Sequence, residues 1–261
     1  MDDLTSTDEH RVALAGDWHG NVTWVQTILP KLHRAAPDVK TILHLGDFGI
    51  WPERRGKGFL KSVDYWCKKS GIERILVTLG NHEDHARMEK LWASRPGQVI
   101  ELTDHIHVLP RPYFFRLGAT RFLSLGGANS VDYMDRTVNR DWWLEEQITD
   151  TQVAAAMTGG PVDVMLTHET VNDGTLKVQQ LLATNPIGFH SDELRYSAHS
   201  RAQVSQVWEA LRPSILAHGH MHVPDGRDYG DGRRVYSLGC DTQKGNIALL
   251  TLDTLDVEML A

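Results

Sequence analysis

The sequence predicts an α/β (α+β) fold in which mixed β-sheets are flanked by helices, and three observations support this prediction. Apolar runs of strand length alternate with helical stretches in the first third of the chain, which is typical of βαβ units. Short strands with turns follow from about 98 to 127, which favours antiparallel hairpins. Strand-like and helical stretches then alternate again toward the C-terminus.

Three apolar strands are predicted in the first part of the chain, at residues 11–16, 39–47 and 72–81. Helices separate them, at residues 21–36 and within 57–70. We therefore expect these strands to run parallel and to be joined by right-handed crossovers.

The second half of the chain repeats this alternation. Helices are predicted at 143–158 and 201–211, and strands at 162–168 and 214–220. The segment 169–200 interrupts the pattern with polar and turn-forming residues. We interpret it as an insertion or lid that faces the substrate, and a surface excursion with one short helix is an equal alternative.

Composition limits the classes of function. A chain of 261 residues with 41% hydrophobic and 23% charged residues is typical of a soluble globular protein, and we expect a polar tail at 1–10 and one domain at 11–261. The formal net charge of −7 argues against broad binding to nucleic acid or anionic membranes. Only Cys67 and Cys240 are present, so we expect no disulfide framework and a cytoplasmic location.

Five of the predicted strands end next to side chains that can bind a metal ion. These side chains are Asp17 and His19, Asp47, Asn81 and His82, His168, and His220 and His222. Because ligands bind at the carboxyl ends of strands in open α/β sheets, these groups can converge in space. Carboxylate, amide oxygen and imidazole without thiolate suit manganese, iron, cobalt, nickel or zinc.

The order of these motifs resembles the signature of the calcineurin-like metallophosphoesterases, in particular members of bacterial and phage type. The motifs read DWH at 17–19, GD at 46–47, GNHE at 80–83, TH at 167–168 and GHMH at 219–222. Each motif alone is weak, but all five in the family's order are specific. The resemblance implies a four-layer αββα sandwich of two mixed sheets.

The resemblance also implies the role of each ligand. One metal ion would be held by Asp17, His19, Asp47 and His222. The other would be held by Asp47, Asn81, His168 and His220. Two divalent or trivalent ions are expected, with Mn²⁺ first and Fe, Zn, Co or Ni as alternatives. Asp47 would bridge the ions, a hydroxide between them would attack phosphorus, and His82 would stabilise charge or protonate the departing alkoxide.

One departure from the family pattern argues against a protein phosphatase. Many protein phosphatases of the superfamily read G-D-x-x-D-R-G, whereas this chain reads GDFGIWPERRG, so the second Asp and its Arg are absent. His82 must then find another partner, with Glu83 or a backbone carbonyl as alternatives, or it has none. Arg54 and Arg55 either replace the missing positive charge or form a solvated turn.

Candidate substrate contacts are Asn129, Arg136 and His218, with Ser130 as a further candidate. Trp142 and Trp143 more often anchor a helix than stack on a nucleobase.

These observations predict a dinuclear metal-dependent phosphoesterase that acts on small phosphodiesters, including 2′,3′- or 3′,5′-cyclic nucleotides. A phosphomonoesterase or protein phosphatase is the main alternative, and a nuclease or a non-catalytic scaffold follows. The expected partner is a small phosphate ester, with no membrane and no long nucleic acid, and the oligomeric state stays open.

Overall fold

Strand β2 (Arg11–Ala15) shows how the sequence builds the layers of the fold. Its side chains point alternately to its two faces, as in any strand. Val12 and Leu14 pack in a core between two β-sheets, whereas Ala13 and Ala15 pack in a second core against helices. The computed structural model describes residues 1–6 and 9–260, and it leaves the side chains of residues 53–55 undescribed.

Within the described residues the first sheet has seven strands. The three predicted apolar strands lie side by side and parallel in it, and a fourth strand at 106–108, which this prediction did not include, continues the parallel order. In spatial order its strands are β14 (Val257–Met259), β13 (Ile247–Thr251), β2, β3 (Thr41–His44), β4 (Arg74–Val77), β6 (Ile106–Val108) and β5 (Ile100–Glu101). Strands β13, β14 and β5 run antiparallel to their neighbours at its edges.

The second sheet also has seven strands and is mixed. In spatial order they are β1 (Asp2–Asp3), β7 (Tyr113–Leu117), β8 (Thr120–Leu125), β9 (Val164–Thr167), β10 (Ile215–His218), β12 (Arg234–Ser237) and β11 (Asp225–Asp228). The pair β7–β8 is the predicted antiparallel hairpin, and β8, β9, β10 and β12 are parallel. The first residues of the chain therefore include an edge strand.

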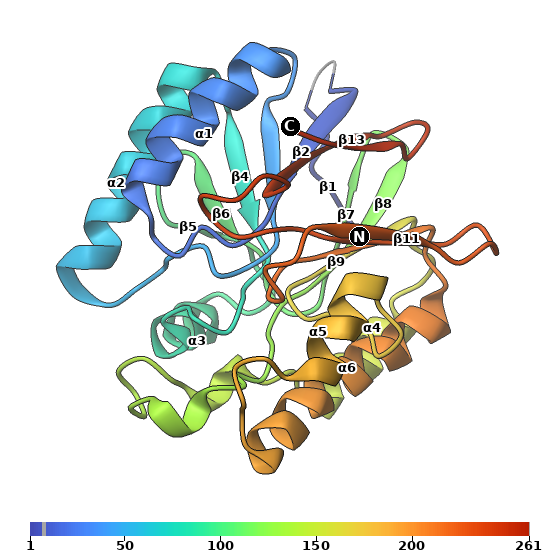
Figure 1. The fold of residues 1–261 in the computed structure, drawn as a ribbon. Coiled ribbons are helices and arrows are strands. Elements are labelled where there is room, and N and C mark those ends of the chain that lie inside the picture. Colours follow the sequence, from blue (N-terminus) through green and yellow to red (C-terminus); the bar gives the residue numbers. More distant parts are fainter. Residues whose placement is uncertain (7–8, 261) are drawn as a thin grey trace.

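Helices cover the outer face of each sheet (Figure 1). The first sheet is covered by α1 (Val22–Ala35) and α2 (Glu53–Ser70), and the second by α4 (Asp150–Thr158) and α6 (Ser191–Leu211). The remaining helices are α3 (His85–Ser94), α5 (Leu176–Thr184) and the short 3-10 turns η1 (Tyr133–Asp135) and η2 (Leu144–Glu146). This arrangement confirms the predicted fold class.

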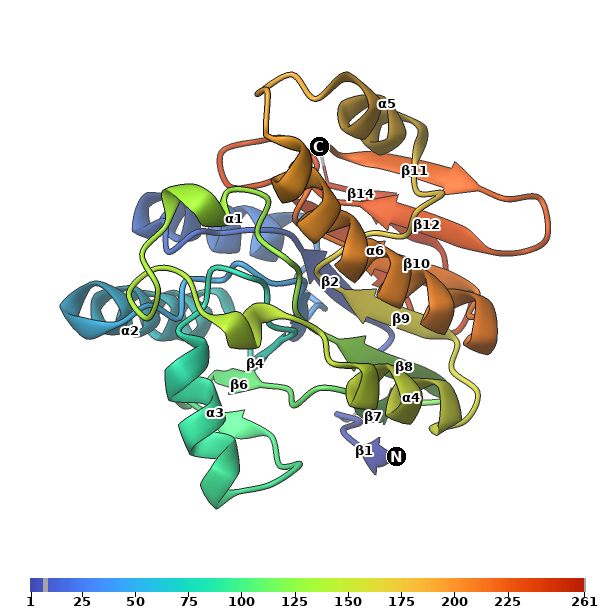
Figure 2. The same ribbon diagram turned by 90° about the horizontal axis from the view of Figure 1, so that it is seen from below.

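Two helix predictions need correction. The stretch 143–158 is not one helix, because the side chain of Thr149 caps a new helix at the amide of Gln152. Helix α6 begins ten residues before the predicted 201, because Glu193 accepts a hydrogen bond from the amide of His190 and stabilises an earlier start. The segment 169–200 thus contains α5 and the first turns of α6. In Figure 2, α6 runs across the second sheet and α5 lies at its edge beside β11.

No helix in residues 1–6 and 9–260 is both long and apolar enough to cross a bilayer.

Candidate metal centre

The predicted ligands lie in the loops that leave the carboxyl ends of neighbouring strands. Asp17 follows β2, Asp47 follows β3 and Asn81 follows β4 in the first sheet. His168 directly follows β9 in the second sheet, and His220 comes just after β10. Parallel strands bring these loops to the same end of each sheet, as the sequence pattern predicts.

Four of the predicted ligands have a left-handed backbone conformation, with φ of 45° at His19, 50° at Asp47, 63° at His220 and 53° at His222. This conformation costs on the order of 1–3 kcal/mol at a residue other than glycine. Hydrogen bonds hold it in place, since the amide of His19 donates to the Asp47 carbonyl at 2.8 Å and that of His220 donates to the Asp17 carboxylate at 3.0 Å. Strain of this kind concentrates at functional sites.

Two glycines allow the backbone to approach the carboxylates closely. A Cβ atom on Gly80 would lie 2.2 Å from Oδ1 of Asp47, and one on Gly219 would lie 2.6 Å from Oδ1 of Asp17. Any larger residue at either position would displace the carboxylate, so glycine is required there.

All seven predicted ligands meet in one cluster. Ligand atoms of His19, Asp47 and His222 lie within 4.8 Å of one another, and so do those of Asp47, His168 and His220. The remaining two are adjacent to this cluster. Asp17 Oδ1 lies 3.5 Å from His168 Nδ1, and Asn81 Oδ1 lies 2.9 Å from His168 Nε2. Asp47 belongs to both groups, which is the position that a bridging ligand requires.

The donor set fits two metal ions. Oδ2 of Asp47 is buried without a hydrogen-bond partner among the described residues, although it lies 3.7 Å from Nε2 of both His19 and His82. A buried carboxylate oxygen without a donor is costly unless a cation neutralises it. The mixture of carboxylate, amide and imidazole suits Mn²⁺ and similar ions.

Strong interactions between the charges accompany this geometry. Burial alone would raise the pKa of Asp47, but the nearby His168 and His82 lower it well below its ordinary value. Burial raises the pKa of Asp17 to about 7, and the charge of Asp47 adds to this effect. Burial lowers the pKa of His222 to about 4, so its imidazole is neutral at physiological pH, as a metal ligand must be.

Two of the histidines are oriented by partners that the sequence analysis missed. Nδ1 of His19 lies 3.0 Å from a carboxylate oxygen of Asp241, and Nδ1 of His168 lies 2.7 Å from the carbonyl oxygen of Leu45. Such partners fix the imidazole tautomer and direct Nε2 toward the metal. Asp241 follows a strand and a glycine in the stretch SLGCD, so the pattern that identified the ligands would also have identified it.

Glu83 does not pair with His82, contrary to one of the three expected alternatives. Its carboxylate accepts hydrogen bonds from the amides of Phe48 at 2.6 Å and Gly80 at 2.7 Å. It therefore ties the loop after β3 to the loop after β4, which supply Asp47 and Asn81. The neighbouring Asp84 caps α3, as its position before the helix predicts.

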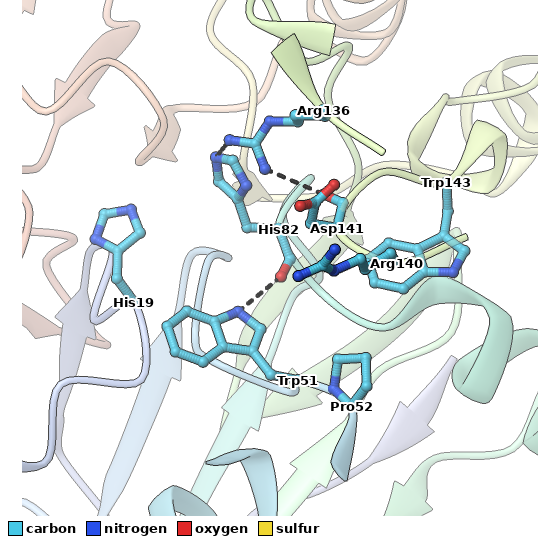
Figure 3. A pocket seen from close by; sticks show the side chains of 8 residues that line it. All are labelled: His19, Trp51, Pro52, His82, Arg136, Arg140, Asp141 and Trp143. Atoms are coloured by element: carbon cyan, nitrogen blue, oxygen red, sulfur yellow. Dashed lines mark hydrogen bonds between the residues drawn. The ribbon is translucent and has the colours of Figure 1, made fainter. Parts of the chain in front are cut away.

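The partner of His82 is Arg136. Nη2 of Arg136 lies 3.0 Å from Nε2 of His82 (Figure 3). The guanidinium is also paired with Asp132. Because a guanidinium can only donate, Nε2 of His82 is the acceptor in this arrangement. Burial lowers the pKa of His82, and the positive charge of Arg136 contributes.

A buried chain of hydrogen bonds supports Asn81. The side-chain amide of Asn81 donates to Oγ of Ser130 at 2.8 Å, and this hydroxyl donates to the carboxylate of Glu146 at 2.5 Å. Glu146 also accepts from Trp142 Nε1 and from the Tyr196 hydroxyl. The amide nitrogen of Asn81 is thereby turned toward Ser130, which leaves its oxygen facing the cluster.

Of the predicted substrate contacts, one lines a pocket and two are buried. Arg136 lines a pocket at the cluster. Asn129 is buried, and its side chain donates to the Tyr196 carbonyl on α6. His218 is also buried, and its Nε2 contacts the hydroxyl of Thr170. Both side chains therefore contact the protein interior, because α6 and the loop after β9 cover them.

Two pockets adjoin the cluster, and His82 lines both. The larger one has a volume of about 750 Å³ and includes Trp51, Arg136, Arg140 and Trp143 (Figure 3). The second has a volume of about 450 Å³ and is lined by four of the cluster's side chains, Asp47, Asn81, His220 and His222, together with His82. Side chains of the cluster thus line both of these spaces, each of which can hold a ligand.

Comparison with known proteins identifies the class. A model of the calcineurin-like phosphoesterase family matches residues 10–224, and the chain therefore belongs to this family of metal-dependent phosphoric ester hydrolases. A search of curated proteins finds no match.

Solved structures share the fold at low sequence identity. A dimetal phosphatase from Danio rerio is 13% identical with a TM-score of 0.56, covering 94% of this chain and 93% of that chain. The protein TT1561 of Thermus thermophilus is 10% identical with a TM-score of 0.55, covering 96% and 98%. GAP50, the anchor in the inner membrane complex of Plasmodium, is 11% identical with a TM-score of 0.51, covering 96% and 88%.

Proposed function

We propose that the chain hydrolyses small phosphodiesters with the help of two bound metal ions, Mn²⁺ being the first expectation. The two pockets that side chains of the cluster line carry this proposal. A phosphodiester has an organic group on each of two ester oxygens, so a phosphate at the cluster would direct one group into each pocket. Nucleotide-derived diesters are candidates because Trp51 and Arg140 offer an aromatic and a cationic surface in the larger pocket. In 2′,3′- and 3′,5′-cyclic nucleotides both ester oxygens belong to one sugar, so these candidates would use the larger pocket alone.

The ions would be held by the seven clustered side chains, with Asp47 between them. When bound, they would polarise the phosphoryl oxygens and make a water molecule acidic enough to supply a nucleophile near neutral pH.

Arg136 and His82 act together in this proposal. The guanidinium of Arg136 is held by Asp132 and donates to a phosphate oxygen, which compensates for the missing arginine of the longer G-D-x-x-D-R-G motif. Once the phosphate takes this hydrogen bond, Nε2 of His82 is released from Arg136. His82 can then carry the proton that the departing alkoxide requires. The side chains of Arg54 and Arg55, the earlier candidates for the missing charge, lie outside the described side chains.

A phosphomonoesterase is the second candidate, because an arginine beside the cluster would also favour the additional charge of a monoester. Parallel assays of the manganese-loaded protein with bis(4-nitrophenyl) phosphate and 4-nitrophenyl phosphate separate the two. We expect the larger kcat/KM for the diester. A strong preference for the monoester would overturn the proposal in favour of the alternative.

A further inference from the structure

The second pocket has an apolar wall. It is formed by α5, the first turns of α6 and the loop between these helices, and its apolar side chains include Leu181, Leu182, Pro186, Ile187, Phe189 and Leu194. Asp47, His220 and His222 of the cluster line the same pocket. An apolar surface thus continues directly from the place where phosphate would bind.

This wall is preformed. The side chain of Asn185 accepts a hydrogen bond from the amide of Phe189 and donates to its carbonyl oxygen, both at 3.0 Å, which fixes the loop between the helices. Ile187 nevertheless remains 75% exposed, although it is a large apolar residue in a fixed loop. Covering an exposed apolar side chain at the edge of a pocket with a ligand is favourable, because it removes apolar surface from water.

Arg201 supplies a positive charge in the same pocket. It is 8% exposed, and the hydrogen bond that its guanidinium makes to the protein runs from Nη1 to Ser197 Oγ at 2.7 Å. The nearby carboxylate of Glu169 interacts with it electrostatically, but the two form no ion pair within 4 Å among the described residues. A guanidinium has five N–H donors, and the other donors of Arg201 make no hydrogen bond to the part of the chain that the structure describes, so they can bind an anion.

We propose that this pocket binds an apolar alkyl or aryl substituent of a phosphodiester, while Arg201 binds an oxygen of its phosphate. This inference rests on the proposed function and narrows the substrate to acyclic diesters with one apolar alcohol. A cyclic nucleotide, whose two ester oxygens belong to one sugar, would leave the apolar wall uncovered. Hydrolysis adds water across one P–O bond and yields an alcohol and a phosphate monoester, so monoesters with an apolar chain should also bind as products.

The test uses methyl, propyl, butyl and hexyl phosphate as probes of the manganese-loaded protein, with Kd measured by calorimetry. Each methylene that enters the pocket should lower Kd about threefold to fourfold. Ile187→Ser and Phe189→Ala should flatten this dependence on chain length. Leu176→Ser is the matched control, because Leu176 is 68% exposed on α5 but does not line the pocket, and it should leave the dependence unchanged.

Arg201 is tested by the same series. Arg201→Gln should weaken the binding of every probe by a similar factor of about 10 to 100, because the lost hydrogen bond is to the phosphate and not to the chain. A loss that grows with chain length would contradict this assignment.

Equal Kd values for all probes, or a dependence on chain length that Ile187→Ser and Phe189→Ala leave intact, would overturn the pocket assignment. Hydrolysis of bis(4-nitrophenyl) phosphate, measured separately, reports on the proposed function alone. A chain-length dependence without any hydrolysis would support the pocket and contradict the diesterase proposal, whereas hydrolysis without the dependence would do the reverse.

Discussion

The floor of the site and its rim are built in different ways. The floor consists of side chains at the ends of β-strands, where Asp17, Asp47, Asn81 and His168 are at most 2% exposed. The rim consists of helices and loops, in which Ile187 is 75% exposed. A rigid floor can fix chemistry common to a family, whereas exposed loops can vary to fit different substrates. The comparison therefore predicts that changes in the floor abolish turnover and that changes in the rim alter selectivity.

The largest effect is expected at the centre of the floor. Asp47→Asn keeps the size of the side chain but removes the charge with which it would bridge two cations, so turnover should fall by orders of magnitude. The measurement is kcat/KM with bis(4-nitrophenyl) phosphate, together with the melting temperature as a control for folding. A folded Asp47→Asn variant whose kcat/KM lies within tenfold of the wild-type value would contradict the difference between floor and rim.

His82 lies where floor and rim meet. Its removal should slow the chemical step without changing metal binding. His82→Ala should reduce kcat by about 10² to 10⁴ because proton transfer is lost, while manganese content stays at the wild-type level. The defect should be smaller for diesters with acidic leaving groups. If all diesters lose the same factor, His82 does not act as the proton donor.

Breaking the hydrogen bonds that support the ligands of the floor should have a smaller effect. Ser130→Ala breaks the hydrogen-bond chain that turns Asn81 toward the cluster, so manganese affinity should fall about 10-fold to 100-fold. Ser124→Ala is the matched control, because Ser124 is equally buried but pairs with Thr78 away from the ligands. Equal affinities for both variants in a calorimetric titration would refute this role.

The effect with the least influence on turnover concerns stability and pH. Burial raises the pKa of Glu146 to about 7 from the usual 4.5, so the folded protein binds this proton more tightly than the unfolded chain does. The resulting stabilisation is complete below pH 4.5 and is lost as the pH rises through 7, a change of about 3 kcal/mol. Between pH 4.5 and 8, the free energy of unfolding of the metal-free wild type should therefore fall relative to that of Glu146→Gln. If the free energies of unfolding of the two proteins change in parallel with pH, Glu146 does not contribute in this way.

The floor could be predicted from the sequence, whereas most of the rim could not. Each ligand follows an apolar strand and a short turn, a local signal that survives in a single sequence, and Asp241 carries the same signal. The contact between His82 and Arg136 joins residues 54 positions apart, and no local pattern specifies it. The position of the Arg201 guanidinium in the second pocket likewise depends on how α6 packs on the second sheet.

The helix predicted at 143–158 was wrong for a similar reason. Residues 143–158 have helical composition, but the chain turns after η2, where Glu146 is held by Ser130, Trp142 and Tyr196. Tertiary hydrogen bonds therefore override local propensity there.

The central claim is that seven side chains from five strand ends form a site for two metal ions. Anomalous diffraction from crystals of the manganese-loaded protein tests it most directly. We predict two peaks about 3.5–4 Å apart, with the carboxylate of Asp47 between them. A single peak in the cluster, or manganese bound only elsewhere, would contradict the account.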